Sequence, residues 1–529
     1  MTGWFDPSVL ARTATMLLTA NIFGRHSDKR LIEALGALPQ DVFDYSAAQG
    51  DFWIDYVADL GDGWNPTYAV ARGIAEPELH GTRPGQVLVM GGDEVYPYPS
   101  RAAYERRTVS PYREAFVARV ARPDVFAIPG NHDWLDSLIA FSRLYCRPKP
   151  GFAGCATRQT RSYFALALPQ DWWLLGVDLQ LGAEFDEAQV LYFEQVAARM
   201  GEGARVILCV PEPQWIYEKL YPGYEAYSAR TLDFFCKEVI HHPVALTLTG
   251  DLHHYRRHTN AAGVHKVVAG SGGAFLHPTH QPEMAELQDG FTEQALYPEK
   301  PVSARIAWRN LLFPFLNPKG CAMAGLVYAL SAWFASSRLE APDLATLGTA
   351  FQAAMAVALR DPVCGLWLML VVSGIVFFTD THSRWYRLLG GATHAMLHLA
   401  ASLVLAWLAA RFTTDVLGLR YGAPLQLIIA GPLVMLGGSF VGGWLIGLYL
   451  LVSINVFGRH NTEAFSSLRV QDYKQWLRMR VDAAGNLTVW SFAIDRVPRR
   501  WRADASGTPL PDDARATAPR IVDMFSVPR

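Results

Sequence analysis

A short apolar run, Val125-Phe126-Ala127-Ile128, leads through Pro129 directly into Gly130-Asn131-His132-Asp133. Apolar runs of this length next to turn residues are typical of buried strands. Three similar polar strings follow other apolar runs, and they are Ala58-Asp59-Leu60-Gly61-Asp62-Gly63, Gly92-Asp93-Glu94-Val95-Tyr96 and Gly250-Asp251-Leu252-His253-His254. Each string alone would indicate only a turn. Four of them in order, each at the end of a predicted strand, indicate a functional site.

Short apolar runs alternate with helical patterns between residues 50 and 300. The predicted strands are Trp53–Ala58, Gln86–Met90, Val125–Ile128, Trp173–Val177, Val206–Val210 and Val244–Thr249. Helices with one apolar face are predicted at Ala102–Ala121, Glu187–Met200 and Ala229–Ile240. This alternation predicts an α/β sandwich, in which functional residues lie in loops beyond the carboxyl ends of strands. The polar strings are therefore expected to meet at one edge of one sheet.

In the order D-x-G, G-D-x-x-Y, G-N-H-D and G-x-x-H, the four strings resemble the calcineurin-like metallophosphoesterase superfamily. The first two strings most resemble purple acid phosphatases. The resemblance covers about residues 50–280. It implies an α/β fold in the form of a four-layer α-β-β-α metallophosphoesterase sandwich. It also implies an enzyme that hydrolyses phosphate esters at two adjacent metal ions.

The resemblance implies four ligands for the first metal ion, namely Asp59, Asp93, Tyr96 and His253. Asp93 would bridge to the second metal ion, which Asn131 would also bind. Tyr96 would supply a phenolate, a hard donor that favours an iron(III)-type centre. It would compensate for Gly61, which stands where the superfamily usually has a histidine.

The resemblance also implies how the reaction is catalysed. Two adjacent cations clamp a phosphoryl group and lower the pKa of a bridging water. His132 would donate a proton to the leaving oxygen, and Asp133 would orient the imidazole ring.

Two departures from the superfamily pattern affect the second metal ion. Asp251 replaces one histidine, and Glu212 in Pro211-Glu212-Pro213 is the donor nearest to the place of another. The resulting ligands carry only oxygen donors, and they are Asp93, Asn131, Glu212 and Asp251. Such donors suit manganese or magnesium better than zinc, so we expect iron and/or manganese, with magnesium or zinc as alternatives. Glu212 is either a substitute ligand or a turn cap beside a weakly bound second ion.

Charge is distributed unevenly along the 529 residues. The 47 basic and 49 acidic side chains give a net charge of -2, and 51% of the residues are hydrophobic. These values exclude a disordered chain and predict no nucleic-acid partner. Four stretches lack charges altogether, and they are Cys321–Ser337, Pro362–Thr379, Leu388–Ala410 and Tyr421–Gly458. Because roughly 20 apolar residues cross a bilayer core, the sequence predicts a helical transmembrane bundle.

Four spans are predicted, at residues 321–337, 362–379, 391–410 and 424–456. The stretch Leu344–Leu359 is interpreted as an interfacial helix, with a fifth or sixth span as the alternative. His394 and His398 lie four residues apart in one span, and we expect a hydrogen-bonded pair between helices rather than a metal site. His277 and His280 either line the pocket or cap a loop.

The sequence is divided into four segments. Residues 1–45 form a membrane-proximal N-terminal segment, 46–310 the metallophosphoesterase domain, 320–457 the transmembrane domain, and 458–529 a C-terminal segment. A hairpin around Ala484-Gly485-Asn486 is expected to pack on the soluble domain. The start of the chain lacks the pattern of a signal peptide, no C-x-x-C pair occurs, and basic residues follow the last span. These features predict an integral membrane protein with its soluble domain in the cytoplasm.

The leading hypothesis is a membrane-bound, dinuclear metal-dependent phosphohydrolase. Four spans exceed what tethering requires, so a phosphorylated and lipidic substrate is expected in the bilayer. The alternative is a catalytically weak or inactive phosphate-binding membrane sensor or scaffold, indicated by the two missing histidines. The presence of Asn131, His132 and Asp133 argues against that alternative. A transporter is less favoured, because the spans contain few ionisable groups.

Overall fold

The computed structural model describes residues 1–23, 42–117, 119, 121–147, 149–179, 184–224, 228–336, 338–379, 382–503, 509–513 and 518–529. Two compact units divide the chain. The first unit contains Met1–Thr2, Ala11–Ser303 and Arg469–Arg529, and the second contains Gly3–Leu10 and Ala304–Leu468. Helix α1 (Pro7–Phe23) belongs to the predicted N-terminal segment, and residues 24–41 of that segment lie outside the described residues.

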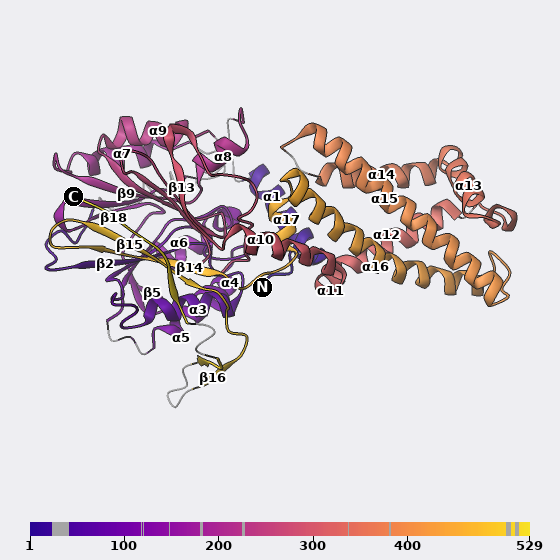
Figure 1. The fold of residues 1–529 in the computed structure, drawn as a ribbon, viewed down its shortest axis with the longest axis horizontal. Helices are drawn as coiled ribbons and strands as arrows, with labels where there is room; N and C mark the ends of the chain where they lie inside the picture. The colour runs from indigo at the N-terminus through magenta and orange to yellow at the C-terminus, as the bar shows by residue number, and fades with distance from the viewer. Residues whose placement is uncertain are drawn as a thin grey trace. The chain divides into compact units, whose positions relative to one another are not determined.

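Two eight-stranded sheets form the first unit within the described residues (Figure 1). In one sheet the order is β18-β15-β14-β2-β3-β4-β6-β5. Its strands are β2 (Phe52–Val57), β3 (Val87–Met90), β4 (Asp124–Ala127), β5 (Lys149–Phe152), β6 (Cys155–Thr157), β14 (Lys474–Val481), β15 (Leu487–Ile494) and β18 (Arg520–Val527). In the other sheet the order is β1-β7-β8-β9-β10-β12-β11-β13. Its strands are β1 (Phe43–Asp44), β7 (Phe164–Ala167), β8 (Trp172–Gly176), β9 (Arg205–Val210), β10 (Val244–Thr249), β11 (Tyr255–Thr259), β12 (His265–Ala269) and β13 (Thr292–Tyr297).

All six predicted strands are present, but the expectation of a single sheet is wrong. Strands β2, β3 and β4 are parallel neighbours in one sheet, whereas β8, β9 and β10 are parallel neighbours in the other. Alternation along the sequence shows that strands exist, and strand pairing decides which sheet each one joins. The polar strings therefore follow strands of two different sheets.

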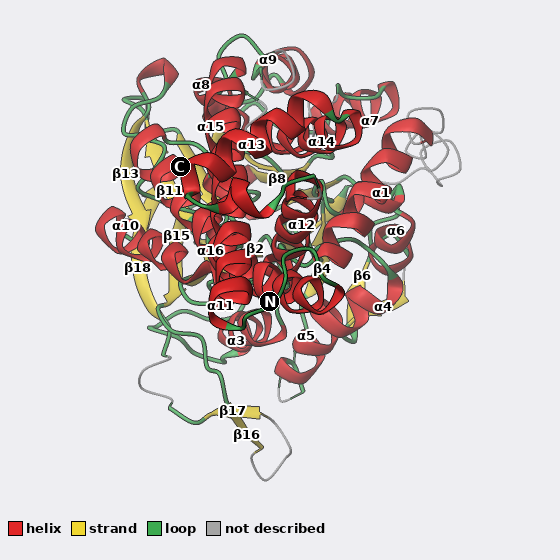
Figure 2. Cartoon of the chain, turned by 90° about the vertical axis from the view of Figure 1, so that its right-hand side faces the viewer, coloured by secondary structure: helices red, strands yellow, loops and turns green. Residues whose placement is uncertain are grey.

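The C-terminal strand β14 pairs antiparallel with β2, from Leu477 opposite Tyr56 to Val481 opposite Phe52. Its other neighbour is β15, with which it forms a hairpin. Arg478 of β14 and Asp55 of β2 form a fully buried ion pair, with 2.7 Å between Nε and Oδ1. A two-stranded ribbon, β16 (Trp501–Ala503) with β17 (Pro509–Pro511), is separate from both sheets (Figure 2).

Helices accompany both sheets. They are α3 (Trp64–Ala75), α4 (Arg101–Tyr104), η2 (Glu105–Val109), α5 (Ser110–Ala115), η3 (Asp133–Asp136), α6 (Ile139–Tyr145), η4 (Pro169–Asp171), α7 (Glu187–Ala197), α8 (Gln214–Leu220), α9 (Arg230–Phe234), η6 (Phe235–Ile240) and η7 (Gln288–Gly290). In Figure 1, α7 and α9 lie on one side of the strands, and α3 and α5 lie on the other. The helix predicted over 102–121 ends at Ala115 and contains the π-helical turn η2, which its apolar pattern did not indicate.

Three apolar clusters hold the first unit together. One contains residues of both sheets, such as Phe126 and Leu248. A second joins the sheet of β2 to α3 and α5, and a third joins the sheet of β9 to α7 and η6. Each fully buried Leu, Ile or Phe side chain in such a cluster contributes about 1.5–3 kcal/mol.

The second unit is helical. Its elements are η8 (Trp308–Leu312), α11 (Phe313–Leu316), α12 (Pro318–Ser336), η9 (Ala341–Leu344), α13 (Leu347–Arg360), α14 (Pro362–Phe378), α15 (Arg384–Arg411), η10 (Phe412–Val416), α16 (Pro424–Phe457) and α17 (Asn461–Ser466), and α10 (Lys300–Ala307) leads into it. Figure 2 shows α12, α14, α15 and α16 close together. A Cβ atom on Gly438 of α16 would lie 2.7 Å from Cβ of Tyr328 of α12, so glycine permits this close approach.

Two helical segments, Arg384–Val416 and Pro424–Phe457, are long and apolar enough to cross a membrane. Leu347–Arg360 and Pro362–Phe378 pass the same test only as a pair bent by 99°, which gives up to three spans in the described residues. Helices occupy all four predicted span positions, and the number four stays a prediction.

Candidate metal centre

Asp59 begins the site, two residues beyond β2. Its carboxylate is fully buried and accepts hydrogen bonds from the Tyr96 hydroxyl at 2.7 Å and from the backbone N–H of Asp251 at 2.9 Å. At the neighbouring Gly61, a Cβ atom would lie 2.6 Å from the carbonyl oxygen of Glu94 and 2.6 Å from Oγ1 of Thr108. The backbone of Glu94 and the side chain of Thr108 therefore leave no room for a side chain at residue 61.

The residues predicted to bind the first metal ion lie around the hydroxyl oxygen of Tyr96. It lies 2.7 Å from Oδ1 of Asp59, 2.9 Å from Oδ2 of Asp93 and 2.9 Å from Nε2 of His253. His253 Nε2 and Asp59 Oδ1 are themselves 3.4 Å apart. Neighbouring ligands of one metal ion with bonds of about 2.0–2.2 Å are separated by roughly 3 Å. These four donors, supplied by three loops, thus have the mutual spacing of a ligand set.

Three predicted ligands have strained backbones. Asp59, Asp93 and Asp251 have φ angles of +59°, +55° and +65°. A non-glycine residue in this left-handed region costs on the order of 1–3 kcal/mol, and such residues cluster at functional sites. The strain falls on residues in the loops that follow β2, β3 and β10.

Asn131 and His132 extend the site from the loop after β4. The buried Oδ1 of Asn131 accepts no hydrogen bond from any described residue. The backbone N–H of His132 donates to Asp93 Oδ1 at 2.8 Å, and its ring Nδ1 lies 2.7 Å from the carbonyl oxygen of Pro97. A carbonyl oxygen only accepts, so Nδ1 carries the proton of the neutral ring. Burial lowers the pKa of His132 below its usual value.

Asp133 is fully buried beneath these loops. Its Oδ2 accepts hydrogen bonds from the backbone N–H groups of Gly130 at 2.9 Å and of Glu94 at 3.3 Å, and its Oδ1 accepts one from the Tyr104 hydroxyl. These contacts join the loop after β3 to the loop after β4. The predicted role of Asp133 in orienting the His132 ring stays a prediction.

Asp251 and Glu212 are the donors predicted for the second ion. The Asp251 carboxylate accepts a hydrogen bond from the Tyr217 hydroxyl. Glu212 follows β9 and is 7% exposed. The carbonyl oxygen of Pro211 accepts a hydrogen bond from Gly250 at 3.1 Å, which joins the Glu212 loop to the Asp251 loop. The structure thus places both residues in adjoining loops, and the ligand role of Glu212 stays a prediction.

Acidic groups dominate the electrostatics of the site. Burial raises the pKa of Asp59 to about 8 and that of Asp251 to about 7. Burial, together with the charges of Asp133, Asp59 and Asp251, also raises the pKa of Asp93. Bound cations favour the charged form of such carboxylates, because opposite charges lower their pKa values.

These residues fit a cation in two respects. The raised pKa values show buried carboxylates without enough positive charge around them, and the Asn131 oxygen needs a donor or a cation. Among the described residues, however, no group of three or more His, Cys, Asp or Glu side chains is placed to hold a metal ion. The donor shared by Asp59, Asp93 and His253 is the phenol of Tyr96, which lies outside those four residue types.

Lys474 was not predicted as part of the site. This β14 residue is fully buried, and its Nζ donates hydrogen bonds to the carbonyl oxygen of Ala274 at 2.6 Å and to Oγ of Ser271 at 3.2 Å. Burial lowers its pKa to about 7, while the charges of Asp472, Asp62 and Asp59 act in the opposite direction. Lys474 lies almost 200 residues beyond the region that resembles the metallophosphoesterase superfamily. The only sequence signal for it is the hairpin that is expected to pack on the soluble domain.

Both histidine pairs outside the motifs have defined contacts. His277 Nδ1 accepts a hydrogen bond from the backbone N–H of His253 at 3.2 Å, and the two rings stack with centroids 4.0 Å apart. His280 Nδ1 lies 2.8 Å from the Ser303 hydroxyl. In the second unit, Nε2 of His394 and Nε2 of His398 are 2.9 Å apart, and His398 also contacts the Tyr328 hydroxyl at 2.7 Å. The contact between the two histidines lies within α15, and the contact between helices joins His398 to Tyr328 of α12.

No family model matches the chain, and no curated protein matches it. Among solved structures, it is similar to GAP50, the anchor in the inner membrane complex of Plasmodium, with 13% identity over 46% of this chain and 79% of that chain and a TM-score of 0.33. Purple acid phosphatase PPD1 from yellow lupin seeds gives 14% identity, 44% and 46% coverage and a TM-score of 0.30. PhoD gives 12% identity, 44% and 59% coverage and a TM-score of 0.28. The chain thus has weak structural similarity to phosphoester hydrolases, and at these TM-scores the similarity carries no argument about its activity.

Proposed function

We propose that this protein is a membrane-bound phosphohydrolase that cleaves a phosphate ester with the help of two metal ions. The observation that carries the proposal is the convergence of Asp59, Asp93 and His253 on the Tyr96 hydroxyl, within 2.9 Å in each case. Burying two carboxylates next to a phenol and an imidazole is destabilising when their charges have no partner, and the strained backbone adds to this free-energy cost. A bound cation would compensate for both.

In this proposal, each residue has a defined task. The first ion is held by Asp59, Asp93, Tyr96 and His253, and the second by Asp93, Asn131, Asp251 and Glu212. The two ions, iron and/or manganese, supply positive charge that stabilises the phosphoryl oxygens and acidifies water. His132 exchanges a proton with the leaving oxygen through Nε2, because Nδ1 is held by the Pro97 carbonyl. Asp133 keeps the loops after β3 and β4 together.

The proposed architecture is the four-layer α-β-β-α sandwich. It is supported by the three apolar clusters, one between the sheets and one between each sheet and its helices. For the membrane unit we propose an even number of crossings. Residues on both sides of Ala304–Leu468 fold into one unit, so the chain has to return to the side from which it left. Four spans satisfy this condition, with the soluble unit in the cytoplasm and a lipidic substrate.

The second candidate is a phosphate-binding membrane sensor or scaffold with little or no catalysis. One observation favours it, namely that the Asp251 carboxylate already accepts a hydrogen bond from the Tyr217 hydroxyl. A second ion would have to compete with that contact. The two candidates differ in turnover, because a sensor binds phosphate without hydrolysing an ester.

The test uses the full-length protein in detergent, treated with a chelator and then supplied with manganese or iron. We expect hydrolysis of p-nitrophenyl phosphate that depends on added metal and is lost in Asp93→Asn. Asp233→Asn is the matched control, because Asp233 is exposed and forms an ion pair with the exposed Lys237. Phosphate binding without turnover would favour the sensor. Hydrolysis of soluble esters but of no lipid phosphate in mixed micelles would contradict the lipidic substrate alone.

A further inference from the structure

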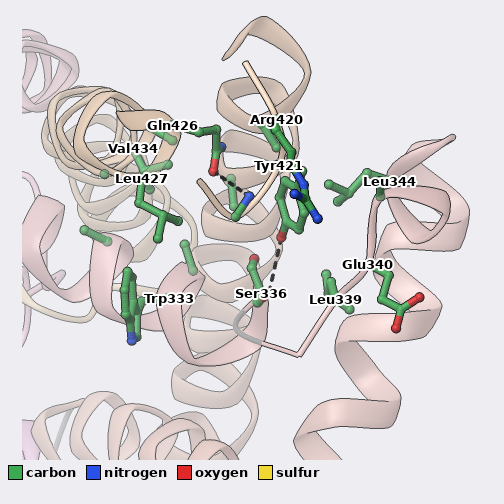
Figure 3. A pocket seen from close by; sticks show the side chains of 18 residues that line it. Trp333, Ser336, Leu339, Glu340, Leu344, Arg420, Tyr421, Gln426, Leu427 and Val434 are labelled. Carbon is green, nitrogen blue, oxygen red and sulfur yellow. Dashed lines mark hydrogen bonds between the residues drawn. The ribbon is translucent and has the colours of Figure 1, made fainter. Parts of the chain in front are cut away.

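The second unit contains a pocket of about 590 Å³ that shares no residue with the candidate metal centre (Figure 3). Its volume lies within the range of ligand sites in proteins, roughly 300–1,000 Å³. Helices α12, α15 and α16 and the short helix η9 contribute its walls. The apolar part of the lining includes Ala329, Ala332, Leu344, Leu427 and Val434.

Ser336 of α12, Glu340 before η9 and Gln426 of α16 are among the polar residues that line the pocket, and two more come from the turn before α16. Arg420 and Tyr421 line the pocket there, and Figure 3 shows them on the opposite side from Trp333. The Tyr421 hydroxyl donates a hydrogen bond to the carbonyl oxygen of Ser336 at 3.2 Å, which ties this turn to the end of α12. Arg420 is exposed, its carbonyl oxygen accepts a hydrogen bond from the backbone N–H of Ala423 at 3.1 Å, and its guanidinium makes no hydrogen bond or ion pair with a described residue. The pocket therefore offers a guanidinium group at one side and hydrocarbon at the other.

The buried side chain of Gln426 stabilises the turn that contains Arg420. This side chain is 2% exposed. Its Oε1 accepts a hydrogen bond from the backbone N–H of Gly422 at 3.3 Å, and its Nε2 donates to Oγ1 of Thr413 at 3.0 Å. On the opposite wall, Trp407 Nε1 donates to the carbonyl oxygen of Leu344 at 3.1 Å and holds η9. Because both walls are held by hydrogen bonds, the pocket is formed before a ligand enters.

The chemistry of the pocket identifies its occupant. An arginine side chain forms paired hydrogen bonds with phosphate, and near the ends of membrane helices it extends toward the headgroup region. Arg420 stands just before α16, one of the two helices long and apolar enough to cross a membrane. A ligand with a phosphate at Arg420 and a hydrocarbon chain along α12 and α16 would satisfy both sides of the pocket.

We propose that this pocket binds one membrane phospholipid, with its phosphate on Arg420 and an acyl chain between α12 and α16. The site is separate from the candidate metal centre, and it does not depend on the phosphohydrolase activity proposed above. Glu340 also lines the pocket, so a lipid whose headgroup carries an amine beside the phosphate has an acidic partner available.

The test is photo-crosslinking of the full-length, chelator-treated protein in dodecyl maltoside, which prevents hydrolysis of the probe. The probe is dodecyl phosphate with a diazirine in its chain, and labelled peptides are mapped by mass spectrometry. We expect labelling of α12 and α16 residues that line the pocket, despite the excess of uncharged detergent. Unlabelled phosphatidylglycerol should displace the probe, and inorganic phosphate should not.

Two variants test separately how the phosphate and the hydrocarbon chain of the probe contribute to binding. Arg420→Gln should weaken probe binding about tenfold, because it removes a charged hydrogen-bonding partner of phosphate. Arg411→Gln is its control, since Arg411 pairs with Asp415 at 2.7 Å and lies outside the pocket lining. Gly431→Phe should abolish pocket labelling, because a Cβ atom at Gly431 meets nothing within 4 Å and a larger side chain can fill the space.

Gly374→Phe in α14 is the control for the filling variant, because its Cβ also meets nothing within 4 Å and it does not line this pocket. Labelling spread evenly over the helices, and unchanged by Arg420→Gln and Gly431→Phe, would overturn the proposal in favour of ordinary annular lipid. Displacement by inorganic phosphate alone would overturn it as well, because the site would then recognise an ion without a chain.

Discussion

The hydroxyl oxygen of Tyr96 lies 2.9 Å from Nε2 of His253, although 157 residues separate the two in the chain. Tyr96 follows β3 in one sheet and His253 follows β10 in the other. The contact therefore bridges the carboxyl edges of two sheets that share an apolar cluster. Any ligand held by both residues would be held by both sheets.

Tyr96→Phe is expected to lower metal affinity at least about tenfold, since it removes one donor of the first ligand set. If iron is the native metal, the variant should also lose the absorption band of an iron–phenolate centre. Metal content and the absorption spectrum of the purified protein measure both effects. Tyr255→Phe is the control, because it removes a buried hydroxyl that bonds to Asp523 instead. Unchanged occupancy and spectrum in Tyr96→Phe would refute the ligand assignment.

His132→Ala is expected to reduce kcat about 10²–10⁴-fold, the usual contribution of a general acid or base. Burial lowers the pKa of His132, so its protonated form is lost as pH rises through a value below 6.5. If the protonated ring is the acid, kcat should fall as pH rises through the pKa of His132. This decrease should be absent in His132→Ala. A pH–rate profile of the metal-loaded protein measures it, and an identical profile in the variant would exclude His132 from proton transfer.

In the metal-free protein, the Asp59 and Asp251 carboxyls are expected to contribute stability that is lost as pH rises from about 4 to about 8. Asp59 and Asp251 have raised folded-state pKa values of about 8 and about 7, so the folded state binds more protons than the unfolded state in this window. This contribution is complete below the unfolded pKa of about 3.9 and falls as the carboxyls ionise. Buried histidines such as His253 and His258, with pKa values lowered to about 3 and about 4, contribute with the opposite sign up to about pH 6.5, so the carboxyl contribution is read from the difference between the parent protein and a variant. Lys474, with a pKa lowered to about 7, acts in the opposite direction above pH 7.

Thermal unfolding of the soluble unit, followed by tryptophan fluorescence at several pH values, measures this loss. Added manganese or iron should remove most of it, because bound cations stabilise the ionised carboxylates. Asp59→Asn should flatten the pH dependence without metal, since the amide does not titrate. An Asp59→Asn variant whose stability changes with pH in the same way as that of the parent protein would contradict the raised pKa of Asp59.

Arg478→Ala is expected to destabilise the soluble unit by about 3–5 kcal/mol, because it leaves Asp55 buried without its partner. Arg478 also donates hydrogen bonds to the carbonyl oxygen of Ile74 at 2.9 Å and to Thr82, so its loss affects the end of α3. The exposed pair of Arg529 with Asp171 gives the control, and Arg529→Ala should cost less than about 1 kcal/mol. Equal effects of the two variants on the unfolding midpoint would show that β14 contributes little to the sheet.

Much of the site follows from the sequence, because polar residues at the ends of parallel strands gather at one edge. This reasoning located Asp59, Asp93, Tyr96 and His253, which the structure brings together. It assigned all of them to one sheet, however, because an apolar run does not specify its pairing partners. The distribution over two sheets follows from the pairing of β9 with β10 and of β2 with β3.

Other parts could not be predicted, for physical reasons. Lys474 is brought close enough for its charge to act on Asp59 by the long-range pairing of β14 with β2, which no local pattern encodes. The absence of a side chain at Gly61 became understandable only from the backbone atoms of Glu94 that crowd it. The number of membrane spans depends on whether α13 and α14 cross together or lie apart, and a hydropathy pattern does not distinguish a bent pair from two elements.

The position of β14 next to β2 has a consequence for how the protein is made. Strand β2 is synthesised early, but the edge that β14 covers has no partner until the ribosome has passed Val481. By then the helices between Ala304 and Leu468 have already emerged, so the soluble sheet closes after the membrane unit has been translated. A nascent chain stopped before Lys474 would expose an unpaired strand edge, and such edges promote aggregation. Quality control during biogenesis would therefore act on the C-terminal strands.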